Sequence, residues 1–342
     1  MEERRRSLRL ATLLAVVLAV LTAVSGPVHA QGIPVSSCGT TLSAPGNYVL
    51  TGNLVCPASN GVNITGSGVD LDLSGFTIDG GGDPLAGNNS RCTDGSVGVK
   101  VGTNISNVHI HDGAVRGFTL GIQMNDASCS QVNKMTITRN CFYGVQLNDS
   151  NGNKLATNTV VENGTTLILP GGFFCGGVNS LCGGISLQGS SANHMISQDV
   201  RRNAQAAVLM DNNSTGNIVS GSDASQTGVL FGFDAVGIQD LGMSNIIRNN
   251  TSSGNTGGGI HVFGPHGVVQ SNTASGNGPL GGGHCGPGAS GICIVAGPGL
   301  NLVQGNTALG NTGTDLGDEN PGCDADVWKH NTFGTRNQTC IH

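Results

Sequence analysis

Short apolar segments, each opened by a small residue, recur along most of the chain at a nearly constant interval. The first three begin at Gly98, Gly121 and Gly144, so the first two steps are both 23 residues long. Later copies follow after 22 to 24 residues, or after that interval plus an insertion. They begin at Gly184, Ala207, Gly237, Gly259 and Gly291, with a degenerate copy at Asp315. Polar and apolar residues alternate within each segment, which predicts a short β-strand with one buried face.

Asparagines spaced five residues apart follow these segments in the pattern Asn-x4-Asn-x4-Asn. The triplets are Asn153/Asn158/Asn163, Asn245/Asn250/Asn255 and Asn301/Asn306/Asn311, with partial copies at Asn193/Gln198/Asn203 and Gly267/Asn272/Asn277. The residue two positions after the first member is apolar, as at Leu155 and Ile247, and we expect it to point inward. Asparagine tolerates the left-handed backbone of tight corners, so the triplets predict corners between short strands.

A self-similar period of this length is typical of a solenoid. Three short strands per repeat predict a three-sided coil, and no window has the apolar spacing of an amphipathic helix. The predicted fold class is all-β: a right-handed parallel β-helix of about 22–24 residues per coil with capped ends. Equivalent residues of stacked coils lie about 4.8 Å apart, so the asparagine amides should form hydrogen-bonded ladders. The leucine-rich repeat is the alternative, but its leucine pattern is absent.

The first thirty residues differ from the repeat. A basic stretch, Arg4–Arg9, precedes an apolar run, Leu10–Val24, and small residues precede Gln31, which is the layout of a secretory signal. An uncleaved membrane anchor is the alternative, because the run approaches the roughly 20 residues that span a bilayer. The predicted segments are a signal peptide (1–30), an N-terminal cap (31–60), the β-helix (61–318) and a C-terminal cap (319–342). We therefore expect a secreted or periplasmic location.

Charge and cysteine content narrow the possible partners. Without the signal, 11 Lys and Arg face 19 Asp and Glu, a net charge of −8, so nucleic acid is not expected as a partner. No further apolar stretch is long enough to span a membrane after cleavage. All 11 cysteines follow the signal, which is typical of an oxidising compartment. The predicted disulfides, chosen by proximity in sequence, are Cys38–Cys56, Cys175–Cys182, Cys285–Cys293 and Cys323–Cys340. Cys92, Cys129 and Cys141 remain, so we expect at least one free thiol.

The repeat resembles that of the secreted bacterial right-handed parallel β-helix proteins with a pectate-lyase-like fold, over roughly residues 60–318. For the polysaccharide-cleaving members, the resemblance implies a site on the outer face of one sheet and its bordering loops. The calcium and arginine motifs of pectate lyases and the paired aspartates of polygalacturonases are absent. Gly264–Gly267 keeps only the Pro-His of the alginate epimerases' Asp-Pro-His-Asp motif. The repeat is also similar to that of the β-helix accessory proteins of periplasmic copper maturation.

Three insertions fall at one corner of the predicted coil, just before a Gly-Ile strand. They span residues 164–183, 228–236 and 278–290. Outward residues on these strands, in stacking order, are Lys100, Gln123, Gln146, Ser186, Leu209, Gln239, His261 and Cys293. A polar row walled by loops predicts a polysaccharide groove, with Gln123, Gln146, Ser186 and Gln239 binding substrate. The alternative is an ordinary solvated surface.

Asp240, His261 and Asp211 are the catalytic residues that we predict in this groove. Asp240 occupies a position filled by leucine or methionine in other coils, and we expect His261 beside it, one coil further on. Such a pair could share acid and base roles. Asp126, Asp149 and Asp211 follow strands at nearly the same turn position. Stacked carboxylates could bind Ca²⁺, the one cofactor considered, or act as a glycosidase pair; turn chemistry is the alternative.

Arginines also recur once per coil. Arg139 and Arg202 could bind uronate carboxylates, or Glu162 between them could neutralise them in a surface ladder. His109 and His111 form an outward H-x-H, a candidate metal site.

The sequence leaves two functions open. One is a polysaccharide lyase or glycoside hydrolase acting through the outer face of the Gly-Ile strands. The other is a non-catalytic glycan-binding or surface-display solenoid. An extracellular polysaccharide is the partner considered for the enzyme and for the glycan-binding protein, and the oligomeric state stays open.

Overall fold

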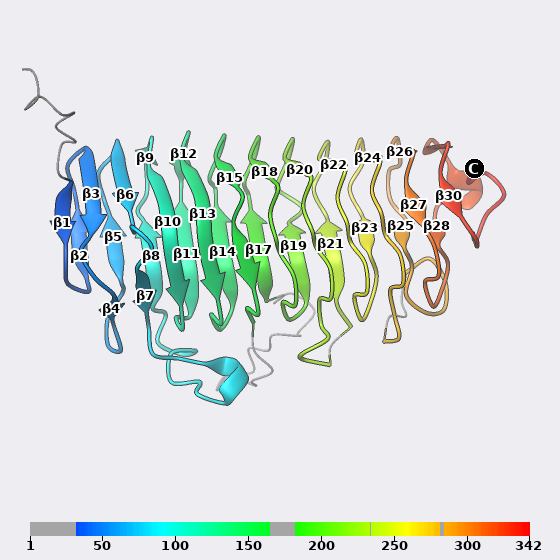
Figure 1. Ribbon diagram of the computed structural model, residues 1–342. Coiled ribbons are helices and arrows are strands. Elements are labelled where there is room, and N and C mark those ends of the chain that lie inside the picture. The colour runs from blue at the N-terminus through cyan, green and yellow to red at the C-terminus, as the bar shows by residue number, and fades with distance from the viewer. Residues whose placement is uncertain (1–31, 165–181, 233, 281–283) are drawn as a thin grey trace, which may run out of the picture. The chain divides into compact units, whose positions relative to one another are not determined.

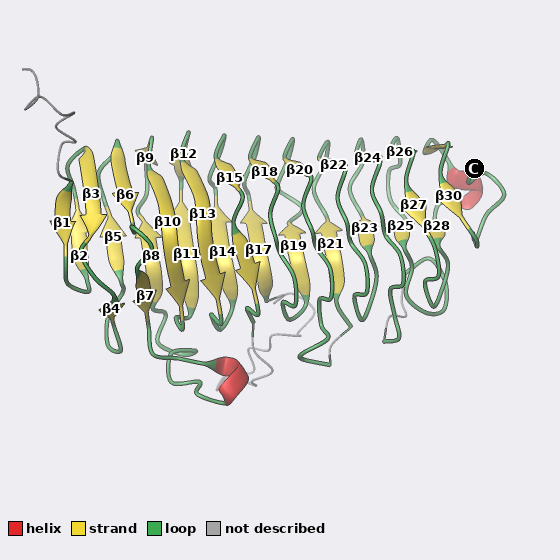
Figure 2. Cartoon of the chain, viewed as in Figure 1, coloured by secondary structure: helices red, strands yellow, loops and turns green. Residues whose placement is uncertain are grey.

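The computed structural model describes residues 32–164, 182–232, 234–280 and 284–342. Within these ranges the regular structure is β-strand, apart from two one-turn 3-10 helices, η1 (Pro84–Ala86) and η2 (Pro321–Cys323). Neighbouring strands of each large sheet come from successive turns of the chain, which therefore winds in stacked coils (Figure 1, Figure 2). No helix in the described ranges is long and apolar enough to cross a membrane.

The Gly-Ile strands belong to an 11-stranded sheet whose strands pair in parallel, coil after coil. Its strands, in order, are β2 (Thr40–Leu42), β5 (Val62–Ile64), β8 (Val97–Val101), β11 (Leu120–Asn125), β14 (Tyr143–Asn148), β17 (Gly183–Gln188), β19 (Ala206–Met210), β21 (Val236–Asp240), β23 (Ile260–Val262), β25 (Ile292–Ile294) and β28 (Leu316–Asp318).

A 15-stranded sheet forms the second side of the coil and part of the third. Its main path is β1 (Ile33–Val35), β3 (Gly46–Leu50), β6 (Val69–Asp72), β10 (His109–Arg116), β13 (Gln131–Thr138), β15 (Lys154–Ala156), β18 (His194–Ile196), β20 (Ile218–Ser220), β22 (Ile246–Arg248), β24 (Val268–Gln270), β26 (Leu302–Gln304) and β29 (Val327–Lys329). The strands off this path are β4 (Leu54–Val55), β7 (Thr77–Asp79) and β16 (Thr159–Val161). Two small sheets pair β9 (Ile105–Ser106) with β12 (Ala127–Ser128) and β27 (Thr307–Ala308) with β30 (Thr332–Phe333).

The long strand β10 shows how the coil acquires its third side. Its first half pairs with β6 and its second half with β7, so β10 passes around a corner. Parallel crossovers that return to the same sheet are right-handed as a rule. The molecule is thus a right-handed, three-sided parallel β-helix, which confirms the fold class predicted from the repeat.

The predicted asparagine ladders are present in the interior of the coil. The amide of Asn153 donates to the side-chain oxygen of Asn193 at 3.1 Å, and that of Asn193 donates to Asn217 at 3.1 Å. In a second ladder, Asn250 donates to Asn272 at 3.0 Å. These side chains are buried, so each ladder supplies hydrogen bonds where water is excluded.

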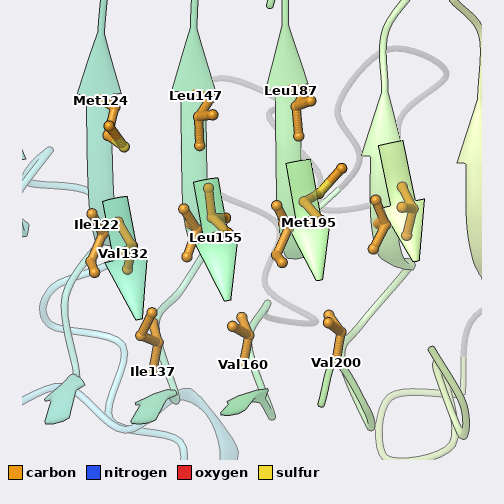
Figure 3. Packing of buried hydrophobic residues seen from close by; sticks show 14 of the residues in the cluster. Ile122, Met124, Val132, Ile137, Leu147, Leu155, Val160, Leu187, Met195 and Val200 are labelled. Carbon is orange, nitrogen blue, oxygen red and sulfur yellow. The ribbon is translucent and has the colours of Figure 1, made fainter. Parts of the chain in front are cut away.

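Inward apolar side chains stack in rows along the coil. Figure 3 shows three rows: Met124, Leu147 and Leu187; Val132, Leu155 and Met195; Ile137, Val160 and Val200. The register places Met124 beside Leu147 and Leu147 beside Leu187, so each row continues from one coil to the next. All of these side chains are fully buried, and their removal from water is the main term that stabilises the stack.

The segments predicted as caps contribute strands of their own. β1 to β4 lie before residue 61, and both β1 and β2 belong to the large sheets. β29 and β30 lie after residue 318 and extend the stack at the other end. The coil therefore begins earlier and ends later than the predicted boundaries, because its terminal turns lack the Gly-Ile pattern that marks the others.

Four disulfides join described cysteines: Cys38–Cys56, Cys92–Cys141, Cys285–Cys293 and Cys323–Cys340. Three of them are pairs that proximity in sequence predicts, and Cys92–Cys141 joins two of the three cysteines left over. Cys129 is free and exposed, in agreement with the expected free thiol. Cys182 takes part in a disulfide, but its predicted partner Cys175 lies outside the described residues.

Candidate functional site

The outward row of the 11-stranded sheet has the register that the repeat predicts. The paired residues, in order, are Lys100, Gln123, Gln146, Ser186, Leu209, Gln239, His261, Cys293 and Gly317. Their neighbours along each strand point the other way and fill the interior. The row is therefore one continuous line of side chains on the outer face of this sheet.

The first part of this row is open to solvent. Lys100 is exposed, and Gln123 and Gln146 are half-buried. The amide of Gln123 donates to the side-chain oxygen of Gln146 at 3.0 Å, so part of their hydrogen-bonding capacity is used between coils.

The middle of the row is covered. Ser186 is fully buried and bonds to the hydroxyl of Tyr143, and Leu209 is also buried. The predicted groove is therefore not continuous, and Gln239 is separated from the open glutamines by this covered stretch. Gln239 belongs instead to a cavity further along the sheet.

A cavity of about 200 Å³ lies over the outer face of β21 and β23. Gln239, His261 and Phe263 line it from the strands and their ends. Asp234 and Ser290 line it from the insertions that precede β21 and β25. These two insertions therefore wall the outer face of the sheet, as their position in the sequence predicts. No lysine or arginine is among the described residues that line the cavity.

His261 is the central polar group of this cavity. It is 8% exposed, and its Nε2 lies 3.0 Å from the hydroxyl of Ser290. Burial, together with the nearby His284, lowers the pKa of His261 to about 4. The imidazole is therefore neutral near pH 7, with one nitrogen that donates and one that accepts.

His284 completes the wall on the side of the third insertion. Its ring meets the ring of Phe263 edge to face, with centroids 5.1 Å apart. Its Nδ1 lies 3.4 Å from Glu319, which also accepts the backbone N–H of Cys285 at 2.7 Å. Burial would raise the pKa of Glu319, but backbone hydrogen bonds and His284 together lower it. The disulfide from Cys285 to Cys293 anchors this wall to β25.

Asp240 and His261 do not form the predicted pair. The register places His261 beside Gln239 and places Asp240 beside Val262. Adjacent residues of a strand point to opposite faces, so Asp240 lies inside the coil, 1% exposed, while His261 faces the outer cavity. The predicted pairing is wrong because the two positions differ by one residue in strand parity.

Hydrogen bonds inside the coil hold the carboxylate of Asp240. Its Oδ1 accepts the backbone N–H of Gly242 at 3.0 Å and the amide of Asn245 at 2.7 Å. Its Oδ2 has no hydrogen-bond partner among the described residues. Burial raises the pKa of Asp240 to about 7, although both hydrogen bonds oppose that shift. Asp240 therefore binds the corner asparagine from inside the coil and does not reach the cavity.

The turn aspartates do not converge on a common site. Asp211 accepts the hydroxyl of Ser214 at 2.7 Å and the backbone N–H of Gly189 at 3.0 Å. Asp126 and Asp149 are exposed, with left-handed φ angles of 46° and 49°. Both features are turn chemistry. Of the described residues, the groups spaced to hold a metal ion do not include these three aspartates, so the structure adds no support for Ca²⁺ there.

Arg139 and Arg202, the two arginines predicted to bind substrate, already form ion pairs. Glu162 lies 3.3 Å from Arg139 and 2.6 Å from Arg202, and Arg139 also lies 2.8 Å from Asp83. These contacts match the neutralised-ladder alternative. Neither arginine is positioned at the cavity, so a uronate clamp would have to displace existing partners.

The sequence did not predict several cavity residues, among them Phe263, Asp234 and Ser290. Phe263 lies two positions after His261 and so shares its face; strand alternation could have revealed it. Ser290 lies at the end of an insertion, where no period fixes its position.

A family model described as NosD, periplasmic copper-binding protein, matches residues 33–173, which is less than half of the chain. The A-module of the mannuronan C-5 epimerase AlgE6 from Azotobacter vinelandii has a TM-score of 0.65 to this structure. Its sequence identity is 14%, and the match covers 90% of this chain and 88% of that one. This chain is a right-handed parallel β-helix protein. No curated protein matches it.

Two further solved structures share the coil of this β-helix protein. A double mutant of the periplasmic alginate epimerase AlgG has a TM-score of 0.59 at 15% identity, covering 90% of this chain and 77% of that one. The DFA-IIIase of Arthrobacter chlorophenolicus A6 in complex with GF2 has a TM-score of 0.57 at 13% identity, covering 86% and 71%. At these identities the likeness establishes the fold alone.

Proposed function

We propose that this protein binds a carbohydrate in the cavity over β21 and β23. The observation that carries the proposal is the grouping of Gln239, His261 and Ser290 beside the ring of Phe263 in one recess. A recess with an apolar ring and a few convergent polar groups is the usual form of a small-ligand site.

The chemistry of the wall suits a neutral sugar. Gln239, His261 and Ser290 together offer donors and acceptors to sugar hydroxyls, and none of them is charged near neutral pH. The described lining contains the carboxylate of Asp234 and no lysine or arginine. A uronate would meet like charge there, so we favour neutral sugars over uronates.

The size of the cavity limits the ligand. At about 200 Å³ it is smaller than the roughly 300–1,000 Å³ of typical ligand sites. We infer that it holds one sugar residue, such as a chain end or branch. The covered stretch at Ser186 argues against a polymer lying along the whole row.

The geometry favours binding without turnover. Most glycoside hydrolases need two carboxyl groups about 5–9.5 Å apart, and Asp234 is the one carboxylate in the described lining. A lyase needs a base whose pKa lies near the working pH, and that of His261 is about 4. The non-catalytic alternative therefore fits better than the lyase or hydrolase.

Related folds support the carbohydrate class of ligand. Structural neighbours include a mannuronan epimerase, an alginate epimerase and a DFA-IIIase complex. The copper binding in the description of the matching family concerns residues 33–173, a different part of the chain from the cavity.

Calorimetric titration with neutral and uronate oligosaccharides tests the proposal. Gln239→Ala should raise the Kd for a bound sugar about 5- to 100-fold, the usual loss for a buried hydrogen bond. Gln146→Ala is the matched control, because it removes the same side chain from the same row outside the cavity. It should change the Kd less than about twofold.

Three outcomes would overturn the proposal. One is the absence of binding across the sugar panel. Another is an equal effect of the two glutamine variants, which would place the ligand along the open row. The third is release of reducing ends or unsaturated products, which would make the protein an enzyme.

A further inference from the structure

A second polar cluster lies on the 15-stranded sheet, on strands close to the N-terminal end of the stack (Figure 1). The parallel pairing of β6 and β10 sets His109 beside Asp70 and His111 beside Asp72. Asp112 follows directly on β10. All of these side chains are at least partly exposed, so they lie on the outer face of the sheet.

Three ligand-type atoms meet within this cluster. The Nδ1 of His109 lies 3.1 Å from the Oδ1 of Asp70, and the Nε2 of His111 lies 2.9 Å from the same oxygen. The two imidazole rings stack with centroids 4.2 Å apart, which aligns both nitrogens with one point. Such separations suit neighbouring ligands of a first-row metal ion, whose bonds to nitrogen and oxygen are about 2.0–2.2 Å.

The far nitrogen of each imidazole already has an oxygen partner. The Nδ1 of His111 lies 2.8 Å from the Oδ2 of Asp112, and the Nε2 of His109 lies 2.7 Å from the Oδ1 of Asn133. Metal-binding histidines almost always donate their second N–H to a carboxylate or carbonyl oxygen, which fixes the ring and leaves the other nitrogen free to bind. Both histidines have this arrangement.

The ring of His111 lies between two carboxylates of the cluster. Both nitrogens of His111 face carboxylate oxygens, at 2.9 Å and 2.8 Å. A neutral imidazole has only one N–H. With that N–H directed to Asp112, the lone pair of Nε2 faces the carboxylate of Asp70, an arrangement that a bound metal ion resolves.

We propose that Asp70, His109 and His111 bind one divalent metal ion, with Asp112 and Asn133 as positioning residues. Imidazole and carboxylate ligands suit Cu²⁺, Ni²⁺ and Zn²⁺, whereas Ca²⁺ and Mg²⁺ prefer oxygen alone. The side chains of Asp70 and His109 are 40% and 37% exposed, so an ion can enter and water can complete its coordination. This site is independent of the carbohydrate cavity.

The competing account is a surface hydrogen-bond network without metal. Lys134 lies 3.6 Å from Asp112, so part of the acidic charge already has a partner. Under that account the cluster binds no metal ion selectively. Metal titration separates the two accounts.

Calorimetric titration of the purified, EDTA-treated protein with Cu²⁺, Ni²⁺, Zn²⁺ and Ca²⁺ is the test. We use a Cys129→Ser background, because the free exposed thiol is itself a metal ligand. We expect one equivalent of Cu²⁺, Ni²⁺ or Zn²⁺ and no Ca²⁺. His109→Ala and His111→Ala should each weaken binding at least about tenfold, and Asp112→Asn should weaken it about 10- to 100-fold through ring position.

His194→Ala is the matched control, because His194 is an exposed histidine on β18 of the same sheet. It should leave affinity unchanged. Electron paramagnetic resonance of the Cu²⁺ complex should show two coupled imidazole nitrogens, and one after His109→Ala. Circular dichroism checks that each variant is folded. No binding of the three transition metals, or binding that survives both histidine variants, would overturn the proposal.

Discussion

Two buried ionisable side chains, Asp240 and His261, influence stability in opposite directions. Burial raises the pKa of Asp240 to about 7 and lowers that of His261 to about 4. Between pH 4 and 7 the folded protein keeps the proton on Asp240 that the unfolded chain loses, so this term weakens stability as pH rises. Between pH 4 and 6.5 the unfolded chain protonates His261 while the folded protein does not, so this term strengthens stability as pH rises.

Asp240→Asn should remove the loss of stability that Asp240 causes as pH rises. Asparagine can still accept the two hydrogen bonds made by Oδ1, from Gly242 and Asn245. Relative to the wild type, the variant should gain up to about 4 kcal/mol of unfolding free energy between pH 4 and pH 7, at about 1.4 kcal/mol per unit of pKa shift. Urea denaturation followed by circular dichroism across this range measures it. Parallel pH curves would show that Asp240 is ionised in the folded state.

His261→Gln should change stability in the opposite sense. The wild type loses stability as pH falls from 6.5 to 4, because only the unfolded chain gains the proton. The variant lacks this loss, so its stability relative to the wild type should improve on acidification, by up to about 3 kcal/mol. The same denaturation series measures the difference. A difference that does not change with pH would mean that His261 titrates normally.

At the scale of elements, the asparagine ladders connect one coil to the next. Asn193 donates to Ser150 O at 2.8 Å and accepts the backbone N–H of Asn153 at 2.9 Å, and both groups are buried. Asn193→Ala leaves them without partners and should cost about 2–5 kcal/mol. Chemical denaturation measures this loss. The exposed Asn212, changed to alanine, is the control and should cost under about 0.5 kcal/mol; equal losses would contradict the role given to the ladder.

The disulfide between Cys92 and Cys141 joins the loop that contains η1 to the coil that contains β14, across 49 residues of sequence. Cys92→Ser should cost about 2–4 kcal/mol, because a long loop in the unfolded chain is no longer closed. Thermal unfolding at matched concentration measures this loss. Cys129→Ser removes a thiol that is not in a disulfide and should leave stability unchanged. Equal Tm values for all three proteins would contradict a stabilising role of the cross-link.

At the scale of the whole molecule, the two proposed sites should act independently. His109 and His261 lie on strands five or six coils apart in the stack, which at about 4.8 Å per coil is about 24–29 Å. Sites at such separations with no shared partners rarely couple. Saturation with Zn²⁺ should therefore leave the Kd for sugar within about twofold. A larger change would show that the coils between the sites transmit a rearrangement.

The repeat was enough to predict the coil and most of its register, because a fixed period makes residues 22 or 23 apart into neighbours. The outward row from Lys100 to Cys293 follows from that period together with the recurring Gly-Ile motif, which restores the register after each insertion. The Asp240–His261 pairing failed on strand parity, since one residue decides between the inner and the outer face. The wall formed by Asp234 and Ser290 comes from insertions, which no period describes.

The proposed metal site likewise could be predicted only in part from the spacing of residues. The H-x-H of His109 and His111 is visible in the sequence as two outward residues of one strand. Its third ligand, Asp70, lies one coil earlier, across the long loop between β7 and β8. Because that loop breaks the count of residues per coil, the register could not be obtained from spacing. Pairing with β6 became evident only in three dimensions.

The central claim is that the cavity binds a neutral sugar. A crystal structure of the protein soaked with a neutral oligosaccharide tests it most directly. We predict one sugar ring in the cavity over β21 and β23, within hydrogen-bonding distance of Gln239 and of His261 or Ser290, with its apolar face toward Phe263. A sugar bound along Gln123 and Gln146, with the cavity empty, would contradict the account.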